Sequence, residues 1–341
     1  MMTTSDASVA APGGPAALST LRIMVRVYSA AQVHAALSWG PLADALQAAF
    51  VRGAQVPLRH AHALAPTDTL LLMPAWDERL LITKLVTAIP GAPSTVEATV
   101  MAMDRATGHP LAVLDGEALT LRRTAATSAL AARHLALPEV ETLLVVGTGR
   151  LAAWMARAHV ALRPGLKRVL VWGRRFEAAH ALAEELRAER TAARSTDGVA
   201  QAVPTLMAVP SEGLEAACRQ ARLITCATTS TEPLVRGAWL APGTHLDLVG
   251  GFKPHMREAD DEAVARARIV VDTHAGAGAE AGDVVQPLQR GVITADAVVG
   301  ELAELLRGDC VGRRTPEDIT LFKSVGTALE DLAAARLVLG C

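Results

Sequence analysis

The sequence predicts an α/β protein of two domains, one with a parallel sheet and the other with a largely antiparallel sheet. The chain has 341 residues, of which 51% are hydrophobic, so it exceeds one typical domain and can fill packed cores. Residues 140–275 alternate short runs of Val, Leu and Ile with amphipathic stretches rich in Ala and Arg, which is the pattern of βαβ units. Between residues 69 and 115, strand patterns are instead joined by short turns, which favours antiparallel pairing.

The composition argues against several classes of function. The formal net charge is −2 and there is no block of like charges, so we expect neither nucleic acid nor a membrane as a partner. The cysteines lack a C-x-x-C spacing and the histidines lack a ligand spacing, so we expect no metal site and no disulfide framework. Residues 1–20 lack the basic start and apolar core of a signal peptide, and we expect them to be a flexible tail on a cytoplasmic protein.

The N-terminal part contains four expected strands, at residues 69–73, 79–86, 95–104 and 111–115. Residues 324–339 form a helical pattern, and we expect this helix to pack back onto the N-terminal sheet. These segments predict a discontinuous α+β domain for substrate binding and dimerisation, formed by residues 21–130 and 318–341. We expect a homodimer, because a small antiparallel sheet with an apolar strand needs cover on its second face.

The middle of the chain contains six expected strands, at residues 142–146, 168–172, 202–204, 223–227, 245–249 and 269–272. The expected helices lie at residues 151–162, 176–190, 214–219 and 258–267. Six strands with crossovers of this length match a Rossmann-type dinucleotide-binding domain, which we assign to residues 131–317.

A glycine fingerprint follows the first of these strands. The strand runs into G-x-G-x-x-A and then into a helix. Gly147 permits the tight turn, Gly149 lets the backbone approach a pyrophosphate, and Ala152 allows close helix packing. The predicted cofactor-binding loop consists of Gly147, Thr148, Gly149, Arg150, Leu151 and Ala152.

The end of the second strand predicts the choice of cofactor. An NAD enzyme usually supplies a carboxylate there, but this chain has Gly173, Arg174 and Arg175. Because arginine offers a fork of donors to a 2′-phosphate, we expect NADPH, with NADH possible. The alternative is that both arginines are a solvated helix start. Thr228 and Thr229 follow the fourth strand and are expected to contact ribose or nicotinamide, or else to form a turn.

Three cations in the N-terminal part are candidate substrate ligands. Arg59 lies in VPLRHAH, Lys84 in LLITKLVTAIPG and Arg123 in LTLRRTAATS. Lys84 occupies an otherwise apolar strand, where a cation is costly unless it meets an anion. A substrate carboxylate would satisfy it. The alternative for each residue is a surface or ion-paired side chain.

Six segments together resemble the signature blocks of the ornithine cyclodeaminase and μ-crystallin family. They are LITKLVTAIPG, MDRATGHPLAVLDGEALTLRRTAATSALAARHLA, VVGTGRLA, LVGGFKPHMREAD, EAGDVVQPL and LFKSVGTALEDLAAA. The resemblance covers the chain from about residue 55 onward and implies a dimeric two-domain enzyme that holds its substrate between the domains. It also implies that Arg59, Lys84 and Arg123 bind the substrate carboxylate, with Lys84 near the reacting carbon–nitrogen bond.

Two features depart from the family pattern. In the cyclodeaminases a catalytic aspartate follows the Gly-Gly pair, but here Phe252 follows Gly250 and Gly251. The chain most resembles the branch that reduces Δ1-pyrroline-2-carboxylate to L-proline and Δ1-piperideine-2-carboxylate to L-pipecolate. The second departure is a short loop between Pro90 and Thr95, which bears on substrate size.

The expected reaction is the reduction of a protonated cyclic imine by hydride. Lys84, among apolar neighbours and arginines, is a candidate proton donor with a lowered pKa. Asp331 is either a polar neighbour of the site or a structural cap. The alternatives are an ornithine cyclodeaminase, an alanine dehydrogenase, and a non-enzymatic protein that binds NADPH and a ligand.

Overall fold

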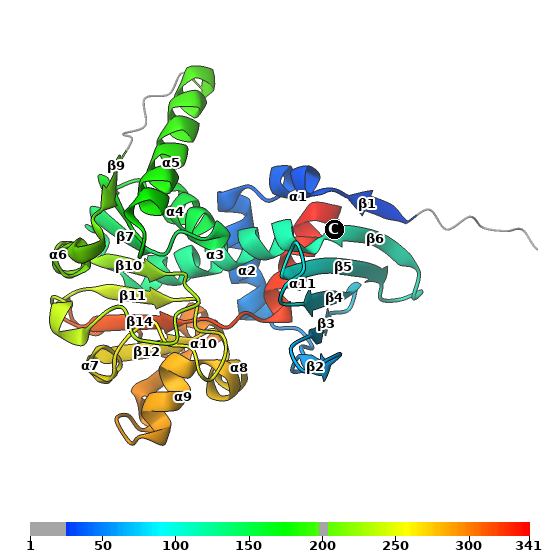
Figure 1. Cartoon of the computed structure of the whole chain (residues 1–341). Helices are drawn as coiled ribbons and strands as arrows, with labels where there is room; N and C mark the ends of the chain where they lie inside the picture. The colour runs from blue at the N-terminus through cyan, green and yellow to red at the C-terminus, as the bar shows by residue number, and fades with distance from the viewer. Residues whose placement is uncertain (1–24, 198–203) are drawn as a thin grey trace, which may run out of the picture.

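The computed structural model describes residues 25–197 and 204–341 and contains two sheets, each with its own helices (Figure 1). The expected tail at residues 1–20 lies outside the described residues, as do residues 202 and 203 of one expected strand. The two-domain α/β prediction, with one Rossmann-type sheet, is confirmed.

The first sheet has six strands in the order β1-β6-β5-β4-β3-β2. All neighbouring strands are antiparallel except β1 and β6, which are parallel. Its strands are β1 Arg26–Tyr28, β2 His60–Ala63, β3 Thr69–Trp76, β4 Leu80–Ala88, β5 Val96–Asp104 and β6 Pro110–Asp115.

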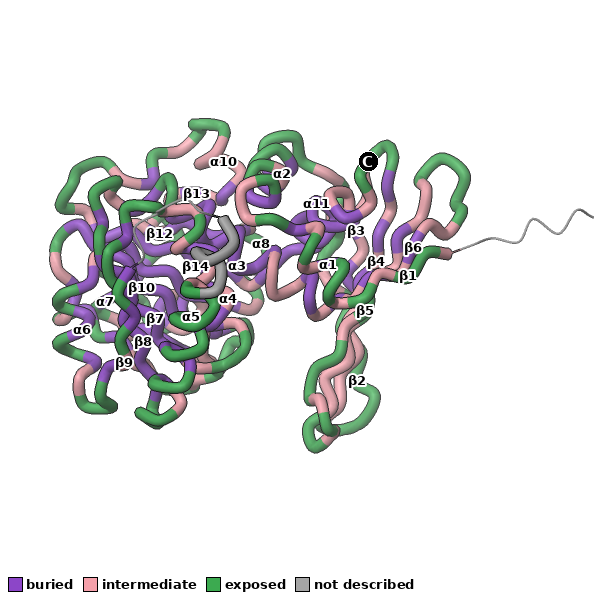
Figure 2. The backbone as a smooth tube through the Cα atoms, turned by 90° about the horizontal axis from the view of Figure 1, so that it is seen from above, coloured by how far each residue is buried: buried purple, intermediate pink, exposed green. Residues whose placement is uncertain are grey.

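Four helices contact this sheet or one another beside it. They are α1 Ala30–Ala36, α2 Trp39–Arg52, α3 Gly116–Leu135 and α11 Ala328–Leu339. On β4, Leu80, Ile82 and Lys84 are buried, whereas Leu81 and Leu85 on the second face are half-buried or exposed. This alternation is the period of a strand with one covered face. Lys84 therefore points into a core. Figure 2 shows buried, purple stretches of backbone along β4.

The second sheet is parallel, with the order β13-β12-β14-β11-β10-β7-β8-β9. Its strands are β7 Thr142–Val146, β8 Arg168–Trp172, β9 Thr205–Val209, β10 Leu223–Cys226, β11 His245–Leu248, β12 Ala267–Val271, β13 Val298–Glu301 and β14 Ile319–Lys323. The helices are α4 Arg150–Leu162, α5 Phe176–Asp197, α6 Leu214–Gln220, α7 Asp261–Arg266, α8 His274–Glu280, α9 Gly282–Gln289 and α10 Leu302–Arg307. Three 3₁₀ turns occupy Ser211–Gly213, Gly237–Trp239 and Ala295–Ala297.

Of the strand expected at residues 202–204, the structure describes only Pro204, which lies outside any strand. The third strand of this region is β9, Thr205–Val209, and Pro204 precedes it. Proline lacks the N–H that a strand ladder requires, so pairing begins after it. Two of the five side chains of β9, those of Thr205 and Met207, are exposed, and the apolar Met207 on the exposed side obscures the alternation in the sequence.

The position of β14 also differs from the expectation. The predicted boundary at residue 318 assigns Ile319–Lys323 to the substrate domain, but β14 pairs with β11 and β12 inside the parallel sheet. Only after Lys323 does the chain return to the first sheet, where α11 contacts α2, α3, β3 and β4 (Figure 1). An apolar run such as ITLFK predicts a buried strand but does not say in which sheet it lies.

Candidate active site

The glycine fingerprint forms a cradle at the carboxyl end of β7. Gly147 has φ +129°, and a Cβ there would lie 2.6 Å from the carbonyl oxygen of Ala227. Gly149 is the N-cap of α4, and a Cβ on it would meet open space. The loop therefore needs glycine at residue 147 to fold and leaves room for a ligand at residue 149, which fits a pyrophosphate at a helix N-terminus.

A cavity of about 200 Å³ opens beside this cradle. Of the predicted cofactor ligands it brings together Gly147, Thr148, Gly149, Arg174, Thr228 and Thr229. It is also lined by Trp172, Gly173, Ala227, Ser230 and Leu234. The side chains of these residues and the open cradle fit a dinucleotide.

The other predicted cofactor residues lie around this cavity and do not line it. Arg150 forms an ion pair with Glu117 of α3, so it faces the first domain. Ala152 is buried in the core behind β7, and Leu151 packs against a neighbouring cluster. Arg175 is exposed next to Arg174.

Lys84 and Arg123 meet at one carboxylate of α11. The Nζ of Lys84 lies 2.7 Å from Oδ2 of Asp331, and the Nε of Arg123 donates to Oδ1 of Asp331 at 3.0 Å. Arg123 also donates from Nη1 to Oε2 of Glu330 at 2.6 Å. All four side chains are buried. The cluster joins β4, α3 and α11 and contains two cations and two carboxylates.

The pKa shifts follow from this burial. Loss of solvation lowers the pKa of Lys84, Asp331 opposes this effect and Arg123 adds to it, and the resulting pKa is about 8. Burial alone would raise the pKa of Asp331, but Arg123 and Lys84 bring it below its ordinary value. Burial raises the pKa of Glu330. The cluster thus contains an amine that can lose a proton near neutral pH.

Arg59 lies in a neighbouring cavity of about 140 Å³ between the two domains. Its Nε is 3.1 Å from Oε1 of Glu280, and its Nη2 donates to the carbonyl oxygens of Val325 at 3.0 Å and Gly326 at 2.7 Å. Gly326 has φ +84°, and a Cβ there would lie 2.7 Å from Nη1 of Arg123. The segment after β14 therefore connects Arg59 with the buried cluster.

Both cavities lie at the carboxyl edge of the parallel sheet. The first is formed by residues that follow β7, β8 and β10, and the second includes Thr273 and Gly326, which follow β12 and β14. Between them lies β11, which ends before Gly250. Ligands of parallel sheets bind at this edge, so a dinucleotide and a small substrate can lie side by side.

The family model for ornithine cyclodeaminases and mu-crystallins matches residues 24–340. The chain belongs to the ornithine cyclodeaminase/mu-crystallin family. A Δ1-pyrroline-2-carboxylate reductase of Paracoccus denitrificans is 36% identical over 307 residues, 89% of this chain and 92% of the relative. Such relatives confirm the prediction of an NAD(P)H-dependent imine reductase and its branch.

Two solved structures have the same fold. The Thermococcus litoralis Δ1-pyrroline-2-carboxylate reductase, in complex with NADH and L-proline, has a TM-score of 0.84 and 30% identity, covering 93% of this chain and 97% of that one. An archaeal alanine dehydrogenase dimer with bound NAD has a TM-score of 0.83 and 26% identity, covering 93% and 95%.

The cyclodeaminase-type aspartate has no counterpart at its expected position in this member of the family. Phe252 follows the Gly-Gly pair and is 40% exposed. The nearby carboxylate of Asp283 is buried, and its Oδ2 accepts from Nζ of Lys323 at 3.1 Å. Asp283 therefore has a structural partner.

The sequence reasoning missed Glu330, Glu280 and Glu258. Glu330 and Asp331 stand next to each other in the apolar stretch ALEDLAAA, and that pattern is the signal that predicts buried acids opposite Lys84 and Arg123. Glu280 carries no comparable signal, because its meeting with Arg59 depends on how the domains lie.

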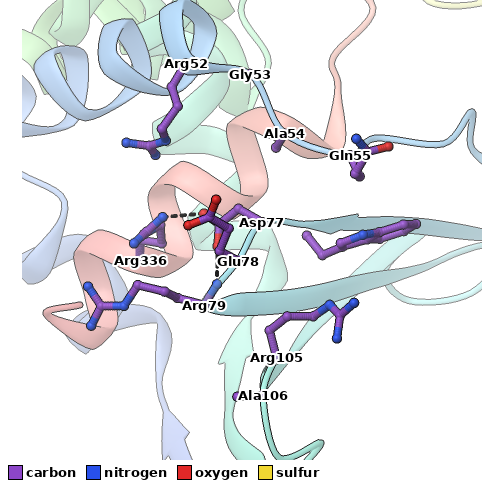
Figure 3. Close-up of a pocket in the computed structure, with 11 residues that line it drawn as sticks. Arg52, Gly53, Ala54, Gln55, Asp77, Glu78, Arg79, Arg105, Ala106 and Arg336 are labelled. Atoms are coloured by element: carbon purple, nitrogen blue, oxygen red, sulfur yellow. Dashed lines mark hydrogen bonds and ion pairs between the residues drawn. The ribbon is translucent and has the colours of Figure 1, made fainter.

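A larger cavity, with a volume of about 1000 Å³, lies elsewhere. It is lined by Arg52, Arg79, Arg105 and Arg336 at the far ends of the first sheet and its helices (Figure 3). Asp77 pairs with Arg336 there and accepts from the backbone N–H of Arg79 at 2.9 Å. None of the predicted site residues lines this cavity, so its size does not mark the active site.

Proposed function

We propose that this chain reduces a small cyclic imino acid with NADPH, converting Δ1-pyrroline-2-carboxylate to L-proline and also accepting Δ1-piperideine-2-carboxylate to give L-pipecolate. The observation that carries the proposal is the buried cluster of Lys84, Arg123 and Asp331 beside the Arg59 cavity, at the same sheet edge as the dinucleotide cradle. The similar reductases of Paracoccus denitrificans and Thermococcus litoralis support the substrate class.

The proposed chemistry divides two tasks among the cations. Arg59 and Arg123 bind the substrate carboxylate, which fixes the imine carbon at the cofactor face. Lys84 donates a proton to the imine nitrogen, directly or through a water molecule, and its lowered pKa near 8 suits this transfer. The bound cofactor supplies the hydride. The product gains one hydride at carbon and one proton at nitrogen.

The preference for NADPH rests on Arg174. Its side chain lines the cofactor cavity, and no carboxylate stands at the end of β8 to bind ribose hydroxyls. A guanidinium there favours a 2′-phosphate. NADH is the alternative, since the Thermococcus litoralis relative is described with NADH.

We also propose a homodimer formed through the first sheet, in a cytoplasmic protein. The archaeal alanine dehydrogenase with a similar fold is a dimer, and the second face of β4 carries the apolar Leu81 and Leu85. In the described part of the chain, no helix has the length and hydropathy needed to cross a membrane.

The deciding experiment follows NADPH oxidation with three substrate sets. We expect steady NADPH oxidation with Δ1-pyrroline-2-carboxylate. Conversion of L-ornithine to proline and ammonia consumes no NADPH, so ammonia release is measured for that substrate, and we expect none because the aspartate after Gly251 is absent. Turnover that requires pyruvate with free ammonia would instead indicate an alanine dehydrogenase. Cofactor binding without turnover of any set would indicate a non-enzymatic binding protein.

A further inference from the structure

Another buried carboxylate, Glu258, lies behind the cofactor cavity. It is fully buried in the segment that precedes α7. Its Oε1 accepts from the backbone N–H of Thr228 at 2.7 Å and from the hydroxyl of Thr228 at 2.8 Å. Its Oε2 accepts from the backbone N–H of Gly250 at 2.8 Å. One carboxylate thus joins the loops that follow β10 and β11.

The loop that follows β10 forms a wall of the cofactor cavity, and the Gly250 loop packs against it. Thr228 lines the cavity, as does Leu234, whose backbone N–H donates to the carbonyl oxygen of Glu258 at 2.9 Å. A Cβ on Gly250 would lie 1.9 Å from the carbonyl oxygen of Thr228 and 2.4 Å from Oε1 of Glu258. The close approach of the two loops therefore depends on glycine at residue 250 and on the carboxylate that binds both of them.

The charges around Glu258 come from three elements. Asp283 of α9 accepts from the backbone N–H of Glu258 at 2.7 Å, and Lys323 of β14 pairs with Asp283. The thiol of Cys226, at the end of β10, is also buried next to this group. Burial raises the pKa of Glu258 to about 7, Lys323 opposes the rise, and Asp283 adds to it. The carboxyl therefore changes its protonation state in the neutral range.

We propose that Glu258 is a positioning residue whose ionised carboxylate holds the Thr228 and Gly250 loops in the arrangement that binds the nicotinamide cofactor. An ionised carboxylate accepts from all three donors, whereas a protonated one presents an O–H to one of them. A buried N–H left without an acceptor is costly, so the loops shift when Glu258 is protonated. Cofactor affinity then falls as the pH drops below about 7. The inference rests on the proposed cofactor site and is independent of the substrate.

The test measures NADH binding by protein fluorescence, without substrate, between pH 6 and pH 8.5. NADH is the probe because it lacks the 2′-phosphate, which itself titrates near pH 6. For the wild type we expect an affinity about tenfold lower at pH 6 than at pH 8. The uptake of one proton changes the binding constant by at most tenfold per pH unit, and this change occurs mainly below the pKa of the group. In Glu258→Gln, which keeps the shape without the charge, we expect weak binding that does not change with pH.

Two further variants keep the test decisive. Glu258→Asp retains a carboxylate, and we expect it to restore part of the affinity together with its pH dependence. Asp247→Asn removes another buried carboxylate of the same sheet, bonded to Thr225 and Ser128 rather than to the cavity, and should keep the wild-type profile. Tight and pH-independent NADH binding by the wild type, or an unchanged profile in Glu258→Gln, would overturn the inference. A wild type that binds neither NADH nor NADPH at any pH would instead contradict the proposed cofactor site.

Discussion

Lys84 and Arg123 differ from ordinary core residues because each brings a charge into a place that water does not reach. Asp331 alone neutralises them only in part, because both cations share it. Glu330 supplies a second negative charge, which pairs with Arg123. A substrate carboxylate that enters the cluster would compete for cations that are already paired. This arrangement keeps the cations ordered before the substrate arrives, which lowers the entropy cost of binding.

Replacing these cations should separate catalysis from cofactor binding. In Lys84→Ala and Arg123→Ala we expect kcat/KM for Δ1-pyrroline-2-carboxylate to fall by roughly a hundredfold or more, because a buried charge-assisted contact is worth about 1.5–3 kcal/mol and proton transfer adds to it. NADPH affinity should stay within about threefold, since neither residue lines the dinucleotide cavity. Near-wild-type turnover in both variants would refute the site, and circular dichroism checks that each one folds.

The pH profile should report the ionisation of Lys84. Its pKa lies near 8, so Lys84 carries its proton below that pH and loses it above. We expect kcat/KM for reduction to be level below pH 8 and to fall about tenfold per pH unit above it. In Lys84→Arg the residual activity should show no such break, because a guanidinium stays protonated. A break that persists in that variant would belong to the substrate imine instead.

Arg174 and Arg175 should contribute to the use of NADPH but not to the use of NADH. Replacing both with Ala removes charge-assisted hydrogen bonds worth about 1.5–3 kcal/mol, or roughly ten- to hundredfold in kcat/KM with NADPH. The value with NADH should barely change, because NADH lacks the 2′-phosphate. An equal loss with both cofactors, or a wild type that prefers NADH, would identify the two arginines as a solvated helix start.

At the scale of elements, the sequence predicts the helices and strands whose pattern depends only on neighbouring residues. Strand β7 and helix α4 follow from an apolar run, a glycine loop and an amphipathic stretch, all within about twenty residues. The long helix α3 is harder, because most of its side chains are buried on every side and such a helix lacks a polar stripe. Strand β14 is placed by contacts with β11 and β12, which are distant in sequence.

In the candidate site too, the sequence indicates some residues and contacts but not others. The glycine loop is local in sequence, and Lys84 stands out because it interrupts an apolar strand. In contrast, the pairing of Arg59 with Glu280 joins residues 221 positions apart, and the bonds of Glu258 to Thr228 and Gly250 link three separate loops. No local pattern carries that information, since these contacts depend on sheet order and on how the domains lie.

Alanine substitutions at the two glycines of the β7–α4 loop should have different effects on stability and cofactor binding. Gly147→Ala forces a Cβ to within 2.6 Å of the carbonyl oxygen of Ala227 in a left-handed conformation, so we expect a loss of about 1–3 kcal/mol in stability as well as of cofactor binding. Gly149→Ala meets no atom within 4 Å and should fold normally, yet its methyl group should block the pyrophosphate. Chemical denaturation and NADH titration measure the two effects. Normal NADH binding by Gly149→Ala would show that the pyrophosphate lies elsewhere.

At the scale of the whole molecule, the first sheet has helices on one face and apolar side chains on the other. Leu85 at the centre of this second face is 40% exposed and stands opposite Leu72 of β3, which is only half-buried. A second copy of the same sheet can cover this face with a two-fold symmetric contact. We therefore expect the wild type to sediment as a dimer at micromolar concentration.

Leu85→Glu places a charge at the centre of that face, where dimerisation would bury it without a partner. Burial of an unpaired charge costs several kcal/mol, so we expect this variant to sediment as a monomer. Val311→Glu is the matched control, because Val311 is 58% exposed in a loop next to the parallel sheet and its replacement should leave the dimer intact. A wild type that stays monomeric at every concentration would contradict the dimer. A dimer that persists in Leu85→Glu would place the interface on another surface, because a glutamate at the centre of the first sheet cannot be tolerated in a dry contact between two such sheets.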